Sequence, residues 1–401
     1  MNTEGPFLAC SIACMRSRTV LLLPLCLLML PPLLQQSVFL ERKVTQVCDC
    51  PGGDVSLQDQ RWSVALDLRI GTRVGDDPEV FGDIRAVLVD DGGNIFVLDQ
   101  LAREVRVFDP SGRHVRTFGR SGRGPGELRH PIGMAWGPDS TIWVADPINL
   151  RYSVFDENGV FITSYRTEPT GYGYSWQGGF DLAGRFYEPV PVLAPGSGLL
   201  WYVRRVDLQL ENVDSVFLPP YQPLTFELPR GSARVPFAAR LVWVLDPAGH
   251  VWFAVTDEYR VFKQRMQGDT VLTVEGAARP MRVTLAERQE AIERLNEFAR
   301  RAGGPELDFS RIPGTKPVIE DLSVDDQGRL WVRLPAEEST DSYDVFSSDG
   351  RYLGSGRSDF DIPEHRRHQV QDGFLYAVLT DSMDVPYVIR AKISPAPGAS
   401  R

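Results

Sequence analysis

Lysine, histidine and cysteine are scarce in this sequence. Its 401 residues include four lysines, five histidines and five cysteines, so arginine makes up most of the 43 basic residues. The formal net charge is −10 and no basic cluster stands out, so we expect no nucleic acid partner. The glycine-rich segment 119–131 (GRSGRGPGELRHP) has no lysine, which excludes a P-loop. Glu127 stands where a dinucleotide-binding fingerprint needs its third glycine.

The first 54 residues differ from the rest of the chain. An apolar run at 20–34 (VLLLPLCLLMLPPLL) follows Arg16 and Arg18, as in a secretory signal peptide. Met15 is an alternative start to Met1, and the absence of a clear cleavage site leaves an uncleaved membrane anchor open. Residues 1–54 are therefore interpreted as a signal peptide or membrane anchor plus a linker, and an extracytoplasmic (periplasmic or secreted) location is expected.

Three of the five cysteines, Cys10, Cys14 and Cys26, precede or lie in the apolar run. The other two, Cys48 and Cys50, have a spacing that suits a surface pair in a linker. A strained disulfide or half of a metal site is the alternative, although the other half of such a site is not visible.

Beyond residue 54 one pattern recurs six times. A turn rich in Asp and Gly precedes a short run of β-branched and aromatic residues, which favours a strand in a half-buried sheet. The runs are IFVLD, IWVAD, FYEPV, VWFAV, LWVRL and LYAVL, which begin at residues 95, 142, 186, 251, 330 and 375. Most copies are spaced by roughly 40–50 residues, the period of a four-stranded propeller blade. The sequence therefore predicts an all-β fold, a six-bladed β-propeller of antiparallel blades over residues 55–394, followed by a flexible tail at 395–401.

Two longer intervals between copies predict insertions. The first is assigned to a Pro/Gly loop at 190–200 together with a Pro-rich stretch at 218–236. The second contains a helical insertion at about 284–303, with capping-box spacing between Thr284 and Glu287. Leu285, Ile292, Leu295 and Phe298 fall on one face of that helix, and its charged face is interpreted as solvated.

The last copy, at 370–393, supplies three strands, and residues 61–70 (RWSVALDLRI) form a lone strand before the first copy. Pairing this N-terminal strand into the last blade closes the ring and removes an exposed edge.

The segment 119–131 then connects the outer strand of one blade to the inner strand of the next, with Leu128 filling the gap between blades. Residues 119–159 resemble an NHL repeat, of the six-bladed TolB-like class of propellers. Asp146, Asn149 and Arg151 keep that family's D-x-x-N-x-R pattern. The resemblance implies a structural role for these three residues, which tie the turn and the neighbouring blades together.

The families that this fold resembles include calcium lactonases, a zinc-dependent lyase and pure binding modules, so the fold does not choose a function. A calcium site needs several oxygen ligands, and the inner strands offer Glu320 and Asp321 without an Asn. Two histidines lie in or beside turns, His130 is isolated, and the segment 363–368 (PEHRRH) reads as a solvated linker with His365 and His368. A GxSxG nucleophile elbow is absent.

A binding function needs fewer specific residues than catalysis or metal binding does. Polar residues at or near the starts of the inner strands should face the channel, and aromatic residues in GYGYSW form either a stacking surface or a packed loop between blades. The candidate ligand-binding residues are Arg85, His130, Arg240, Glu320, Asp321, Tyr172, Tyr174 and Trp176. We therefore expect an exported module that binds a protein, peptide or carbohydrate and has no catalytic residues, metal or cofactor. The alternative is a metal-dependent, lactonase-like propeller hydrolase or lyase with its site in the axial channel.

Overall fold

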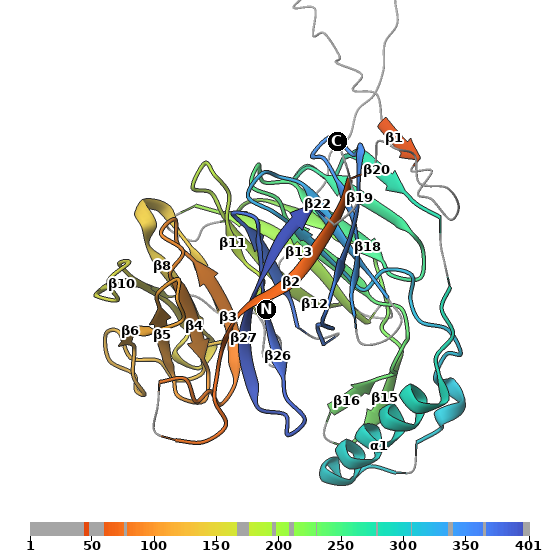
Figure 1. The fold of residues 1–401 in the computed structure, drawn as a ribbon, viewed down its shortest axis with the longest axis horizontal. Helices are drawn as coiled ribbons and strands as arrows, with labels where there is room; N and C mark the ends of the chain where they lie inside the picture. Colours follow the sequence, from red (N-terminus) through yellow and green to blue (C-terminus); the bar gives the residue numbers. More distant parts are fainter. Residues whose placement is uncertain are drawn as a thin grey trace, which may run out of the picture. The chain divides into compact units, whose positions relative to one another are not determined.

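Short antiparallel sheets of four strands are the repeating unit of the molecule (Figure 1). The computed structural model describes residues 44–47, 60–75, 78–166, 176–194, 198–207, 212–229, 231–277, 280–305, 307–335, 340–363 and 366–395. Together these residues form a six-bladed propeller with antiparallel four-stranded blades and one α-helix, which confirms the predicted fold class.

Each blade is built from strands that are consecutive in sequence, apart from one strand of blade 6. Blade 1 has β3 (Ile84–Val89), β4 (Ile95–Asp99), β5 (Glu104–Phe108) and β6 (His114–Phe118). Blade 2 has β7 (Gly133–Trp136), β8 (Ile142–Asp146), β9 (Arg151–Phe155) and β10 (Phe161–Arg166). Blade 3 has β11 (Gly179–Phe180), β12 (Phe186–Ala194), β13 (Gly198–Val206) and β14 (Asn212–Phe217).

The second half of the ring follows the same order. Blade 4 has β17 (Leu241–Leu245), β18 (Val251–Val255), β19 (Arg260–Gln264) and β20 (Thr270–Glu275). Blade 5 has β21 (Asp321–Val324), β22 (Leu330–Leu334), β23 (Ser342–Phe346) and β24 (Tyr352–Ser358). Blade 6 has β25 (His368–Gln371), β26 (Phe374–Thr380), β27 (Pro386–Pro395) and the N-terminal β2 (Gln60–Ile70).

The second strand of a blade is covered on both faces. Every residue of β4 and of β8 is buried, whereas β10 alternates between half-buried and exposed positions. A strand that packs against a neighbouring blade on each side reads as a continuous apolar run, and an outer strand keeps the two-residue period. The six runs identified in the sequence are therefore the second strands of the six blades.

Aspartates organise the turn between the first and second strands. In blade 5 the Asp325 carboxylate accepts backbone N–H bonds from Gln327 and Arg329, at 3.0 and 2.8 Å. Its second oxygen accepts from Arg329 Nε and from Trp331 Nε1, at 2.6 and 2.9 Å. This arrangement satisfies the turn's backbone donors and fixes the large aromatic residue of the following strand.

The glycine-rich segment 119–131 is held by the D-x-x-N-x-R residues. Asn149 Nδ2 donates to the Gly122 carbonyl at 3.0 Å, and Arg151 Nη2 donates to the carbonyls of Gly124 and Glu127 at 2.6 and 2.7 Å. Leu128 is fully buried in the apolar cluster shared by blades 1 and 2. Both observations confirm that the segment serves the architecture.

Closure of the ring depends on β2. This strand pairs antiparallel with β27 from Trp62 opposite Pro395 to Ile70 opposite Val388, as predicted, and Figure 1 shows the orange β2 beside the blue β27. Its first residues, Gln60–Val64, also pair in parallel with β24, so blades 5 and 6 share one eight-stranded sheet. The sequence did not predict this second pairing. Nor did it predict β1 (Val44–Val47), which adds to the outer edge of β20 in parallel.

The helical insertion lies between blades 4 and 5. Helix α1 (Leu285–Ala302) begins with the predicted capping box of Thr284 and Glu287 and ends at Gly303. It packs on the hairpin of β15 (Thr225–Leu228) and β16 (Gly231–Arg234), and Figure 1 shows the three elements together. Within the described ranges, no helix is sufficiently long and apolar to span a membrane.

Two details of the insertions differ from the predictions. The buried residues of α1 are Ala291, Leu295 and Ala299, whereas Leu285 and Phe298 are exposed. The reason is that only a narrow stripe of the helix packs against the small hairpin. Residues 190–200 were expected in a loop, but the described part of this stretch belongs to β12 and β13, which form a long hairpin.

Candidate functional site

Arg367 connects opposite sides of the ring. It stands directly before β25 of blade 6, yet its Nη2 donates to Gln177 Oε1 and to the Trp243 carbonyl, each at 2.8 Å. Gln177 precedes the first strand of blade 3, and Trp243 lies in the first strand of blade 4. Because blades 3 and 6 are opposite in a six-bladed ring, Arg367 crosses the central axis.

Polar residues of blades 4, 5 and 6 lie around this crossing. We call Arg240, Asp321, Arg367 and His368 the axial cluster. Arg240 Nη2 donates to the Glu320 carbonyl, which ties the start of blade 4 to that of blade 5. Burial alone would raise the pKa of Asp321, but the positive charges of Arg367 and Arg333 outweigh it and lower that pKa. Asp321 is therefore a permanent negative charge that balances the arginines.

Ser323 and His368 form a hydrogen-bonded pair between blades 5 and 6. Ser323 Oγ lies 2.7 Å from His368 Nε2, a geometry that a nucleophile and its base would have. The side chains are buried, and burial together with Arg333 lowers the pKa of His368 to about 3. His368 Nδ1 has no hydrogen-bond partner among the described residues, so none of them orients the ring as a third catalytic member would. The pair serves packing, and the interpretation of His368 as a solvated linker residue is wrong because β25 carries it into the core.

Three carboxylates meet at one end of blade 5. Glu320 precedes β21, Asp341 precedes β23 and Asp361 follows β24, and one oxygen of each lies within 4.8 Å of the others. This carboxylate cluster is narrow enough for all three to contact one calcium-sized ion, since opposite ligands of Ca²⁺ are about 5 Å apart.

Arg333 already supplies a positive charge to these carboxylates. The arginine is fully buried, with Nε 3.6 Å from Glu320 Oε2 and Nη1 3.6 Å from Asp341 Oδ2. Burial raises the pKa of Asp341 to about 7, although Arg333 opposes this, and Glu320 and Asp361 raise it further by repulsion. The cluster therefore consists of three carboxylates that repel one another and lie near one buried guanidinium.

Arg85 and Arg366 form a second cationic group, at the seam between blades 1 and 6. Arg85 Nη2 lies 2.7 Å from Asp83 Oδ2, and Arg366 Nη2 lies 3.9 Å from Asp83 Oδ1. Arg366 Nη1 also donates to the Ile84 carbonyl at 2.5 Å. We call Arg85 and Arg366 the arginine pair.

The predicted binding residues are thus only partly brought together. Arg240, Glu320 and Asp321 are neighbours, whereas Arg85 lies at a separate seam. His130 lies on the connection between blades 1 and 2, where its backbone N–H donates to the Asp146 side chain. Trp176 does not form an open stacking surface, because it is buried against Tyr152 and Phe186. Tyr172 and Tyr174 lie outside the described residues, as do all five cysteines and His365.

Five residues of these groups were not predicted from the sequence: Arg366, Arg367, Asp341, Asp361 and the buried Arg333. Arg240 and Glu320 were predicted because they stand just before an inner strand. Arg366 and Arg367 stand in the same position, but the polar segment PEHRRH was interpreted as a solvated linker.

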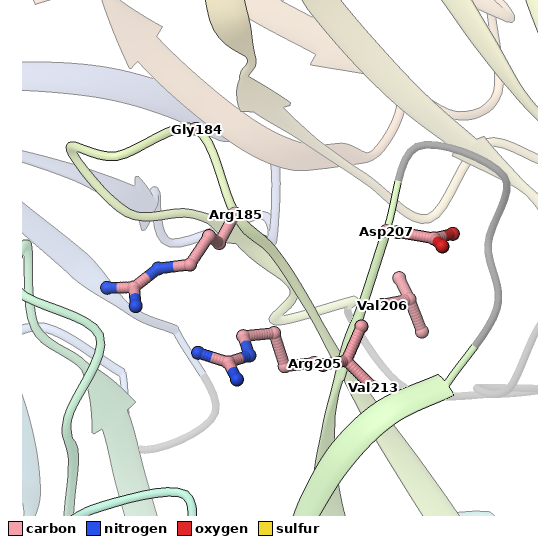
Figure 2. Close-up of a pocket in the computed structure, with 6 residues that line it drawn as sticks. All are labelled: Gly184, Arg185, Arg205, Val206, Asp207 and Val213. Carbon is pink, nitrogen blue, oxygen red and sulfur yellow. The ribbon is translucent and has the colours of Figure 1, made fainter.

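The described residues also line a pocket of 370 Å³ in blade 3, at the opposite end of the strands (Figure 2). Figure 2 shows the guanidinium groups of Arg185 and Arg205 on one side of the pocket and Asp207 on the other. Arg185 pairs with Asp181 at 2.6 Å and Arg205 with Asp214 at 2.7 Å. Both arginines are therefore already neutralised within the blade.

Comparison with known proteins finds similar propellers. No curated protein matches the chain. A DUF4221 family member from Bacteroides vulgatus is 13% identical, with a TM-score of 0.48, over 84% of this chain and all of that one. A protein from Bacteroides fragilis is 10% identical, with a TM-score of 0.45, over 88% of this chain and all of that one. A streptogramin B lyase is 9% identical, with a TM-score of 0.44, over 84% of this chain and 98% of that one. Residues 75–133 match a family model described as a 6-bladed beta-propeller, DUF5128, in agreement with the six blades.

Proposed function

We propose that this chain is an exported propeller of the NHL or TolB-like type that binds a ligand or a protein at the end of the ring where the inner strands begin. One observation carries the proposal. Polar groups of blades 1, 3, 4, 5 and 6 lie at this end, with Arg85 at a seam of its own, and they are fixed by hydrogen bonds such as that of Arg367 with Gln177. Groups held in place before binding lose little freedom on binding, which favours recognition.

The same end offers little to catalysis. The hydrogen-bonded Ser323 and His368 are buried, and a histidine with a pKa of about 3 is a poor base near neutral pH. A metal-dependent hydrolase or lyase is the alternative, and the carboxylate cluster is the feature that would serve it. Arg333 lies 3.6 Å from two of these carboxylates and would repel a cation, which favours the binding function.

The location is part of the proposal and rests on the leader at residues 1–54. Cell fractionation of the producing bacterium tests it, with export expected for the full chain and retention in the cytoplasm when residues 16–34 are deleted. Membrane attachment through this segment would place the full chain in the membrane fraction.

Binding is tested with the purified full-length chain on a glycan array and on a displayed peptide library. We expect saturable binding of at least one member, weakened by Arg240→Gln. Hydrolysis of lactone or aryl ester substrates that depends on added Ca²⁺, Mn²⁺ or Zn²⁺, and is lost in Asp341→Asn, would establish the enzyme instead.

A further inference from the structure

The arginine pair has more positive charge than its surroundings balance. Arg85 and Arg366 share the single carboxylate of Asp83, at 2.7 and 3.9 Å. The seam between blades 1 and 6 is therefore locally positive, although the chain as a whole has a net charge of −10.

Both members of the pair keep an unused donor. The Nε atoms of Arg85 and Arg366 are buried and have no hydrogen-bond partner among the residues that the structure describes. A guanidinium N–H without an acceptor is costly, so an oxygen placed there by a ligand is stabilising. The two side chains as a whole are 26% and 17% exposed, so part of each is open to an anion from solvent, whereas the Nε atoms themselves are buried.

The pair is also held in position. Arg85 Nη2 donates to Gln100 Oε1 at 3.0 Å, and Gln100 Nε2 donates to the Pro131 carbonyl at 2.9 Å, which orients the amide. Arg366 is anchored on the Ile84 carbonyl. Burial lowers the pKa of Arg366, and the Arg85 charge lowers it further while Asp83 opposes this. The two charges are thus fixed near each other with too little negative charge between them.

We propose that the arginine pair binds an oxyanion, the carboxylate or phosphate group of a small ligand. This inference rests on the proposed binding function and adds the chemical class of the ligand. Guanidinium groups match both anions, because their planar N–H donors form charge-assisted hydrogen bonds with two oxygens at once.

Isothermal titration calorimetry of the full-length chain with sodium phosphate, and separately with sodium citrate, tests the proposal at constant ionic strength. We expect saturable binding of at least one anion, with the tighter one identifying the ligand class. Arg85→Gln and Arg366→Gln should each weaken this binding at least tenfold. Arg113→Gln, which removes the same charge from an exposed turn, should leave it unchanged.

Absence of saturable binding of both anions to the unaltered chain would overturn the proposal, as would equal binding by Arg85→Gln. Arg85 donates to the side chain of Gln100 in its own blade and, within the described part of the chain, to no backbone group of another blade, so its variant stays informative if Arg366→Gln does not fold. A glycan or peptide that binds independently of phosphate, citrate and Arg85 would refute the anion site and leave the binding function intact. Metal-dependent turnover would refute the binding function instead.

Discussion

Arg367 and Gln177 are hydrogen bonded at 2.8 Å, although 190 residues separate them in the chain and they stand on opposite blades. A bond of this kind fixes the distance across the ring as well as the contacts between neighbouring blades. It also holds a positive charge next to Asp321, which is buried. The axial cluster therefore contributes to stability and to the shape of the proposed binding surface together.

Replacing Arg367 by methionine should reduce the free energy of unfolding by about 3 kcal/mol, because Asp321 would stay buried with less compensating charge. Guanidinium chloride unfolding followed by tryptophan fluorescence measures the change. Arg113→Met is the matched control, since Arg113 is 83% exposed and pairs with Asp109 of its own turn. Equal effects of the two substitutions would show that the connection across the axis is not stabilising.

Closure by β2 predicts a contrast within one strand. Val64 is 1% exposed and packs in the core of blades 5 and 6, whereas Leu66 is 51% exposed. Val64→Ala should cost about 2 kcal/mol through lost burial and an incompletely filled cavity, and Leu66→Ala should change stability little. Calorimetric melting temperatures of the two variants test this. A similar loss at both positions would argue against the pairing of β2 with β27.

Local chemistry explains why the fold could be predicted. The Asp-Gly turns, the runs such as LWVRL that follow them and the capping box at Thr284 each act over a few residues, so a single sequence displays them. Closure by residues 60–70 could be inferred because the last copy lacked one strand. The second pairing of β2, with β24, could not, because it depends on how the outer edges of two blades approach each other.

The candidate site was less predictable because it depends on contacts between distant segments. Arg366 and Arg367 belong to a polar segment, and their role follows from the residues on other blades that they reach. Asp341 and Asp361 likewise become neighbours only when β23 and β24 are paired. Burial of Trp176 depends on packing between blades, which the aromatic segment GYGYSW alone did not reveal.

The connection between blades 1 and 2 should depend on Asn149. Asn149→Ala removes the donor to the Gly122 carbonyl and a 2.8 Å bond to Asp146, so we expect a loss of about 1 kcal/mol. Amide hydrogen exchange at Gly122 and Leu128, whose N–H groups are bonded within the segment, should accelerate. Asn158→Ala, in an exposed turn, is the control. Unchanged exchange at both amides would refute the structural role of Asn149.

The carboxylate cluster predicts a stabilising substitution. Burial is the largest cause of the raised pKa of Asp341, and repulsion by Asp361 adds to it. Ionisation of Asp341 therefore costs stability as the pH rises from 3.8 towards about 7. Asp361→Asn should therefore raise the melting temperature at pH 8 more than at pH 4, whereas Asp91→Asn, at an exposed turn, should not. If 5 mM Ca²⁺ raises the melting temperature of the unaltered chain but not of Asp361→Asn, the cluster is a cation site.

His368 predicts a pH dependence of the opposite sign. Burial and, to a lesser extent, the charge of Arg333 lower the pKa of His368 from 6.5 to about 3. Between pH 3 and pH 6.5 the unfolded chain therefore holds more protons than the folded chain. Stability from this group is complete above pH 6.5 and decreases as the pH falls, by about 1 kcal/mol per pH unit. The groups that face the ring are Ser323, Tyr343, Asp321, Arg333 and Arg367.

Urea unfolding of the unaltered chain and of His368→Gln at pH 7.5, 6.0 and 5.0 measures this dependence. The difference between their free energies of unfolding at each pH cancels the titration of Asp341 and of the other groups that both chains share. Glutamine keeps an amide near Ser323 and does not titrate. The advantage of histidine over glutamine should therefore shrink steadily below pH 6.5. A difference that stays constant over this range would mean that His368 takes up its proton equally in the folded and unfolded chain, and that it is exposed to solvent.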